Sequence, residues 1–313
     1  MDFSLSSSYF AGYQLSPEAM AAETRALGFA QVELGYFTRE TCLPSWQRAL
    51  SQEGLSVSSI HAFCPVPVEM PQLGPEVFSL ATPNRDEQMA AIRAMRRTLH
   101  CAEEVNARAV VVHGGRVILR RPGFLFGGRP YRSQLEQVFL QNNGVADHAL
   151  AKEEHRLRMA EAGRWLDAVS FALDSLLPAF ETAGIILAFE NLPGVEAFPD
   201  PAEMAFLRQR FPTSALGAWY DIGHGERKAR VGDWPVEETL AQTLDLTVGV
   251  HLHDVRGLDE DHRAPGEGSV NFTALKTLLT RPKLIRVFEP APQVSRSALR
   301  QGVEIIRRCL DEA

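Results

Sequence analysis

The feature of this sequence that most restricts its fold is the alternation of short apolar runs with longer segments of helical spacing. This alternation is typical of parallel β-α-β units, in which each strand is followed by a helix that covers the sheet. Eight such units close most simply into a barrel, so the sequence predicts an α/β protein with a (β/α)8 barrel. The predicted strands are Phe3–Ser7, Gln31–Leu34, Ser56–His61, Ala109–His113, Ile185–Glu190, Leu216–Asp221, Val248–His253 and Leu284–Glu289.

The segments between these runs carry the start and stop signals of helices. The first helix is predicted over Ser16–Leu27. Ser16 can cap its start, Pro17 suits its first turn, and Gly28 can end it. No Gly/Ser-rich linker or change of composition divides the chain, so we expect residues 1–313 to form one domain. The other helices are expected to begin near Pro44, Asn84, Lys152, Asp200, Pro235, Asn271 and Ser295.

One stretch, residues 114–151, interrupts the even spacing because it is rich in glycine and proline. Loops that follow barrel strands lie over the mouth, where enzymes of this fold keep their active sites. We therefore expect a lid-like insertion, and a disordered or purely structural excursion is an equal alternative. The arginines of this stretch could bind a phosphate or carboxylate, although a solvated surface position is favoured for each of them; they are Arg116, Arg120, Arg121, Arg129 and Arg132.

Composition restricts the class of protein. Hydrophobic residues make up 45% and charged residues 23% of the chain, as in globular proteins that fold in water. No apolar run is long enough to span a membrane, and the amino terminus has no signal-peptide pattern. The four cysteines are scattered without metal-binding or disulfide spacing. We therefore expect a cytoplasmic protein with reduced thiols and no membrane partner. The net charge of −7 argues against general binding of nucleic acid.

Polar side chains end six of the eight predicted strands, and in a β/α barrel such residues project into the mouth. A single histidine at a strand end is more often a core or rim residue than a ligand, but six such strands favour a functional site. Carboxylates packed together in a buried funnel repel one another unless a cation compensates them. Mixed carboxylate and imidazole donors suit manganese, magnesium, cobalt, iron or zinc. These residues are His61, His113, Glu190, Asn191, Asp221, His224, His251, His253, Asp254 and Glu289.

Four segments make the chain similar to the xylose isomerase-like TIM barrels: ENLPG, DIGH, HLHD with the GEG that follows it, and the closing FEP. This superfamily includes sugar phosphate isomerases and epimerases, hydroxypyruvate isomerase, inosose dehydratase and the family 2 AP endonucleases. The resemblance extends over nearly the whole chain. It implies one divalent metal ion, of unspecified identity, held by Glu190, Asp221, His251 and Glu289.

The resemblance further implies an isomerase or epimerase that moves a proton next to a carbonyl group through a metal-stabilised enediolate. Glu190 and Glu289, on opposite sides of the substrate, would remove and return the proton. The substrate would be a sugar, sugar phosphate, polyol or keto-acid, and dehydratase chemistry stays open. Relatives with this barrel often pair, so a homodimer or homotetramer is allowed. Substrate contacts are expected from His61, His113, His224, His253, Arg256 and His262.

Two residues near the seventh strand each have two possible roles. His253 lies on the same side of that strand as His251, so it can contact either substrate or a metal ligand. Asp254 points the other way, where orienting a ligand and capping the next loop are equally expected.

The main alternative function is that of an endonuclease IV-like enzyme, which cuts DNA at abasic sites with three zinc ions. That branch adds histidines on strands three and four, and His61 and His113 occupy such places. It also uses an Asp-x-His pair, for which this chain offers Glu260 and His262, and this change argues against a third metal. The acidic net charge and the Gly- and Phe-rich insertion also disfavour a DNA duplex. A barrel that binds ligand without catalysis is a third alternative, which the intact ligand set disfavours.

Overall fold

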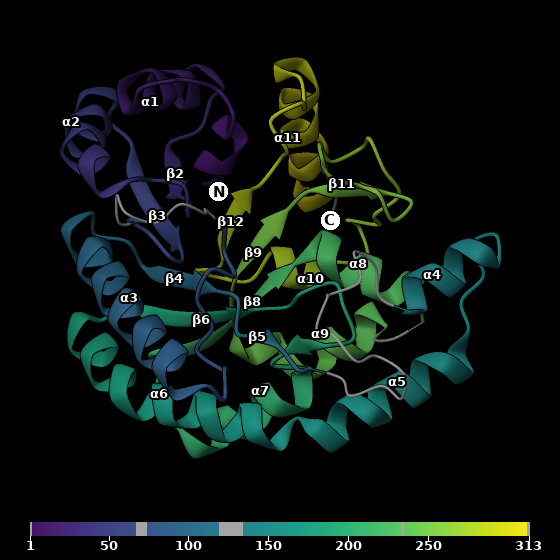
Figure 1. Cartoon of the computed structure of the whole chain (residues 1–313). Coiled ribbons are helices and arrows are strands. Elements are labelled where there is room, and N and C mark those ends of the chain that lie inside the picture. Colours follow the sequence, from purple (N-terminus) through teal and green to yellow (C-terminus); the bar gives the residue numbers. More distant parts are fainter. Residues whose placement is uncertain (1, 67–73, 119–133, 233–234, 312–313) are drawn as a thin grey trace.

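The computed structural model describes residues 2–66, 74–118, 134–232 and 235–311, which form a closed barrel surrounded by helices (Figure 1). Eight parallel strands close the barrel in the order β1-β12-β9-β8-β6-β4-β3-β2, so the predicted fold class is confirmed. The strands are β1 Ser4–Ser6, β2 Gln31–Leu34, β3 Ser56–His61, β4 Ala109–Val112, β6 Ile186–Glu190, β8 Leu216–Asp221, β9 Thr247–Leu252 and β12 Ile285–Phe288.

Strands β2, β3 and β8 have the predicted bounds, and in the other five strands one or both ends are shifted by one residue. The first strand is shorter because Ser6 caps the 3-10 helix η1, Ser7–Phe10, through its side chain. His113 and Glu289 were predicted as the last residues of strands but follow β4 and β12 directly. Both residues therefore leave the sheet at its carboxyl edge.

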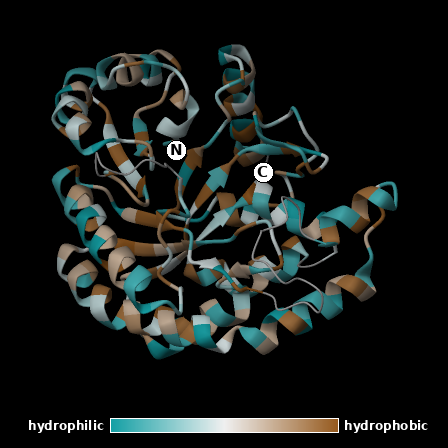
Figure 2. Cartoon of the chain, viewed as in Figure 1, coloured by the Kyte–Doolittle hydropathy of each residue, from teal (hydrophilic) through white to brown (hydrophobic). Residues whose placement is uncertain are grey.

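Helices cover the outside of the barrel, with apolar residues concentrated on the strands and polar residues on the outer surfaces of the helices (Figure 2). Their starts follow local sequence signals: Asn84 accepts hydrogen bonds from the first turn of α3, and Asp200 forms a capping box with Glu203 in α7. These helices are α1 Pro17–Ala26, α2 Leu43–Glu53, α3 Arg85–Glu104, α6 Gly163–Ala183, α7 Pro201–Arg210, α8 Ile222–Arg230, α9 Val236–Thr243, α10 Lys276–Leu279 and α11 Arg296–Asp311.

The predicted insertion is more regular than its composition suggested. Two helices, α4 Gln134–Gln141 and α5 His148–Glu161, occupy its second half and continue beyond it. Helix α5 begins earlier than the predicted start at Lys152, because Asp147 caps it by accepting a hydrogen bond from the Leu150 amide. Residues 119–133, with most of the arginines noted above, lie outside the described residues. The lid and the single domain therefore stay predictions.

Two further contacts hold the segments around the mouth together. The short strand β5, Gly115–Arg116, pairs with β7, Ala197–Phe198, and joins the segments that leave β4 and β6. Arg158 of α5 is fully buried and donates to Glu203 at 2.6 Å, which attaches α5 to α7.

Among the described residues, no helix combines the length and apolar character that a bilayer crossing demands.

The interior of the barrel is filled below the mouth. Trp219 of β8 is 1% exposed and packs with small and branched residues of the neighbouring strands. Gly249 on β9 makes room for it, because a Cβ atom there would lie 2.1 Å from the Trp219 ring. His251 follows two residues further along β9, with its ring centroid 5.2 Å from that of Trp219. The indole therefore forms the floor on which the mouth residues stand.

Candidate metal centre at the barrel mouth

The four residues expected to bind metal all lie at the carboxyl edge of the barrel. Glu190 and Asp221 are the last residues of β6 and β8, and Glu289 follows β12. Asp221 is in register with His251 on the adjacent strand β9. All four side chains are buried, although three of them carry carboxyl groups. Parallel strands thus gather four residues from the second half of the chain at one place.

The side chains converge on one atom, Nδ1 of His251. It lies 3.5 Å from Glu190 Oε1, 3.4 Å from Asp221 Oδ2 and 3.2 Å from Glu289 Oε2. Among the described residues this buried nitrogen has no hydrogen-bond partner. Ligand atoms about 2.1 Å from a metal ion, at tetrahedral or octahedral angles, are separated by about 3.0 to 3.4 Å. The spacing and chemistry of Glu190, Asp221 and His251 therefore fit a divalent cation, and Glu289 adjoins them through His251, with which it is grouped together with Glu33.

Glu33 orients the His251 ring. Its Oε1 atom lies 3.2 Å from His251 Nε2, and its Oε2 atom accepts a hydrogen bond of 2.7 Å from the Ser59 hydroxyl. A ring that donates from Nε2 turns the lone pair of Nδ1 toward the three carboxylates, which is the orientation of a metal ligand. Glu33 was not predicted as a functional residue, although a glutamate inside the apolar run Gln31–Leu34 was a usable signal.

The electrostatics of the centre favour an added positive charge. Burial alone would lower the pKa of His251, but Glu289, Glu33 and Glu190 raise it well above its ordinary value. Burial would likewise raise the pKa of Glu190, yet His113 and His251 hold it well below the usual range. The Glu190 carboxylate thus remains charged and stabilises a cation beside it, whether proton or metal ion.

A second ligand group consists of His61, His113 and Glu190. The Nε2 atoms of the two histidines lie 3.1 and 3.3 Å from Glu190 Oε2. His61 Nδ1 lies 3.1 Å from the backbone oxygen of Ala62, and His113 Nδ1 lies 3.6 Å from Glu76 Oε1. Both rings therefore present Nε2 to the same carboxylate oxygen. Glu76, another residue that the sequence analysis missed, is held in turn by Arg116 at 2.8 Å.

A third ligand group, His224, Asp261 and His262, lies further out. In this group Asp261 accompanies His262, whereas Glu260, which the chain offers in the place of the endonuclease aspartate, points to solvent toward Arg256 and Arg263. The physical reason is local: His262 has a φ of 52°, which breaks the alternation of a regular strand. Asp261 and His262 can therefore both face the mouth from β11, Glu260–Arg263.

The expected substrate residues divide into two sets. His61, His113, His224 and His262 belong to the ligand groups just described. His253 is fully buried, and its Nε2 atom lies 2.9 Å from both carboxylate oxygens of Asp221, so it contacts an expected metal ligand. These five histidines thus surround the centre, whereas their contacts with substrate stay predictions.

Arg256 does not join the cluster. Its side chain is 57% exposed and donates to the backbone oxygen of Glu267. Asp254 accepts hydrogen bonds from the amides of Gly266, Gly268 and Val270, which matches the loop-capping alternative. This contact also explains the GEG segment, because a Cβ atom at position 268 would lie 2.3 Å from the Asp254 carboxylate. A substrate contact by Arg256 has no structural observation in its favour.

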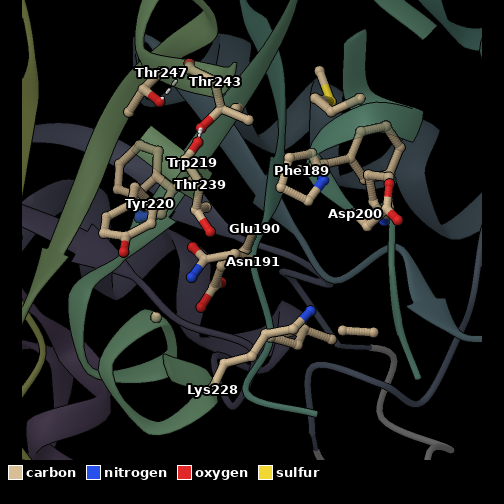
Figure 3. Close-up of a pocket in the computed structure, with 17 residues that line it drawn as sticks. Phe189, Glu190, Asn191, Asp200, Trp219, Tyr220, Lys228, Thr239, Thr243 and Thr247 are labelled. Atoms are coloured by element: carbon tan, nitrogen blue, oxygen red, sulfur yellow. Dashed lines mark hydrogen bonds between the residues drawn. The ribbon is translucent and has the colours of Figure 1, made fainter. Parts of the chain in front are cut away.

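A cavity behind Glu190 is too small for a sugar. Figure 3 shows Thr239, Thr243 and Thr247 on one side of it and Lys228 on another. Its volume is about 40 Å³, room for a few water molecules, since a cavity of about 10 to 15 Å³ holds one. Asn191 lines this cavity and binds both backbone groups of Asp221, at 2.7 and 2.9 Å. Asn191 therefore fixes the end of β8.

Comparison with known proteins adds a family to this geometry. A sequence profile described as "Xylose isomerase-like TIM barrel" matches residues 21–309. The chain aligns with 39% of the length of an uncharacterised protein from Methanocaldococcus jannaschii, at 27% identity over 117 residues, or 34% of this chain.

Solved structures resemble the whole barrel. A D-tagatose 3-epimerase-like protein superposes with a TM-score of 0.68 and 18% identity, covering 99% of this chain and 97% of its own. A 3-keto-D-glucoside 4-epimerase from E. coli superposes with a TM-score of 0.67 and 14% identity, covering 99% of this chain and 100% of its own. A Thermus thermophilus protein from a crystal soaked with ZnCl2 superposes with a TM-score of 0.62 and 19% identity, covering 100% of this chain and 99% of its own. At these identities the likeness establishes the fold.

Proposed function

The chain belongs to the xylose isomerase-like TIM barrel family, and from this premise we propose that it is a divalent-metal-dependent isomerase or epimerase of a sugar-like substrate. The observation that carries the proposal is the convergence of three carboxylate oxygens on His251 Nδ1 at distances of 3.2, 3.4 and 3.5 Å. Proteins of the same fold, one named D-tagatose 3-epimerase-like and another 3-keto-D-glucoside 4-epimerase, support a keto-sugar substrate.

The metal would be held by four residues whose oxygen and imidazole donors suit manganese, magnesium, cobalt, iron or zinc. When bound, the ion supplies Lewis-acid polarisation of a substrate oxygen and offsets negative charge beside it. The chain contributes a buried, water-poor surrounding in which such charges interact more strongly than in bulk water. The proposed ligands are Glu190, Asp221, His251 and Glu289.

Proton transfer is assigned to Glu190 and Glu289, which approach the centre from β6 and from the end of β12. The two carboxylates differ in the number of contacts that their oxygen atoms make. Both oxygens of Glu190 face imidazoles, with Oε2 between His61 and His113. Glu289 Oε1 has one contact among the described residues, a hydrogen bond of 3.4 Å from the Ser8 hydroxyl. We therefore assign the first proton removal to Glu289, whose less engaged oxygen can approach a substrate carbon.

The test is exchange of a substrate proton with solvent. The metal-loaded protein is incubated in D2O with a panel of ketoses, keto-sugars and keto-acids, and deuterium incorporation next to the carbonyl is followed by NMR. We expect incorporation with at least one substrate and a loss of at least about 100-fold in E289Q, the lower range for a general acid or base. Full activity of a folded E289Q variant would remove Glu289 from the mechanism.

A second candidate function is cleavage of DNA at abasic sites by a multi-zinc centre. The observation in its favour is the presence of two further ligand groups next to the first one. Against it, the net charge of −7 is unfavourable for binding a polyanion. Incubation of the zinc-loaded protein with a duplex that contains one abasic site separates the functions. Cleavage without any ketose turnover would favour the endonuclease.

A further inference from the structure

The candidate ligand groups differ in the positive charge that the protein itself provides. Among the described residues, the close ion-pair partners of Glu190, Asp221 and Glu289 are imidazoles. Asp261, in the outer group formed with His224 and His262, has a permanent cation. Its Oδ2 atom accepts a hydrogen bond of 2.7 Å from Arg227 Nη1.

Arg227 is fixed in this position from both sides. It lies on α8, which begins directly after Asp221, and its Nη2 atom donates to Glu136 of α4 at 2.9 Å. Its side chain is only 20% exposed. A guanidinium group remains charged at all ordinary pH values and matches carboxylates geometrically. The cation is therefore permanent, and helix α4 holds it against β11.

The other oxygen of Asp261 is also engaged. Oδ1 accepts a hydrogen bond of 2.9 Å from the His262 amide and lies 3.3 Å from His253 Nδ1. Burial alone would raise the pKa of Asp261, but His253, His262 and His224 together lower it far below its ordinary value. A divalent ion on this carboxylate would have to displace these contacts and would be repelled by the neighbouring guanidinium.

We propose that Arg227 serves as the fixed cation of the outer group, so that divalent ions bind at the inner carboxylates and not at Asp261. Arg227 thereby sets the number of ions that each chain binds. The imidazoles of His224 and His262 then remain available for a substrate hydroxyl group. This last consequence rests on the proposed sugar isomerase or epimerase function, whereas the ion count does not.

The test is the zinc content of the protein after removal of metal, titration with ZnCl2 and gel filtration, measured by mass spectrometry. We expect R227Q to bind one more zinc ion per chain than the wild type, because it removes the cation and retains polar side-chain groups. R227K keeps the charge and should bind the wild-type number. R230Q, which changes another arginine of α8 paired with Glu226, is the matched control and should also bind the wild-type number.

A second variant, D261N, tests the proposal in the presence of Arg227. If Asp261 is not a ligand, D261N binds as many zinc ions as the wild type; loss of one ion per chain would overturn the proposal. An unchanged count in a folded R227Q would overturn it as well, and D261N decides the matter if R227Q does not fold. Failure of ketose turnover with the expected zinc counts would speak against the proposed function alone.

Discussion

Replacing Glu33 by glutamine tests how strongly its contact with His251 controls metal binding. Glu33 is fully buried and accepts hydrogen bonds from His251 Nε2 at 3.2 Å and from Ser59 at 2.7 Å. Glutamine has nearly the same size and keeps an oxygen acceptor. The substitution therefore removes the negative charge and leaves the packing around β2 almost unchanged.

The expected loss follows from the change in hydrogen-bond strength. A hydrogen bond to a charged group contributes about 1.5 to 3 kcal/mol, and one between neutral groups about 0.5 to 1.5 kcal/mol. The difference of about 1 to 1.5 kcal/mol corresponds to roughly five- to tenfold weaker metal binding. This expected loss of affinity lies near the lower end of the roughly 10- to 100-fold losses that are typical when a residue that orients a metal-binding histidine is replaced.

The assay is competition for zinc against a fluorescent chelator at neutral pH, with unfolding curves to verify that each variant is folded. E104Q, at a solvent-exposed glutamate of α3, is the matched control and should bind zinc as the wild type does. An E33Q variant that is folded and binds zinc with wild-type affinity would refute the reasoning, because Glu33 would then be unnecessary for orienting His251.

Three further predictions concern stability. R158M leaves the buried Glu203 without its cation, so the free energy of unfolding should fall by about 3 to 5 kcal/mol in urea titrations. In the control R156M, which changes an exposed arginine, it should fall by less than about 1 kcal/mol. Equal losses in the two variants would contradict the role of Arg158. G249A forces a methyl group against Trp219 and should cost about 1 to 3 kcal/mol, a loss that an unchanged melting temperature would exclude. Saturation of one site with metal at about 100 times Kd should stabilise the protein by about 2.7 kcal/mol relative to the chelated form, and identical unfolding curves would argue against a metal at the centre.

The barrel and the gathering of polar strand-end residues at one rim were predictable because both follow from strand periodicity, whereas the choice of Glu190, Asp221, His251 and Glu289 among them came from the resemblance to the family. In a parallel barrel, the residue that ends each strand reaches the same rim, so position in the chain is enough to bring distant residues together. The start of α7 at Asp200 was predictable for a local reason, since the capping side chain and its partner lie three residues apart.

The residues that escaped prediction depend on contacts that the chain order does not encode. Glu33 reaches His251 from a strand more than two hundred positions earlier, and Arg227 of α8 reaches Asp261 of β11, which lies 34 positions further along the chain. Asp261 replaced Glu260 because the backbone at His262 has a positive φ, which no strand pattern predicts. Tertiary proximity and backbone conformation, more than residue type, therefore limited the prediction of the site.

The indole that packs beneath His251 closes the axis of the barrel below the centre. Since Trp219 and its neighbours fill the axis of the barrel, nothing of substrate size can pass from one end of the barrel to the other. On the proposed function, substrate therefore reaches the centre from the carboxyl ends of the described strands and not through the barrel axis. Spectroscopic probes and immobilising tethers attached at the opposite end of the barrel should leave the proposed activity unaffected, and those attached at the carboxyl edge should reduce it.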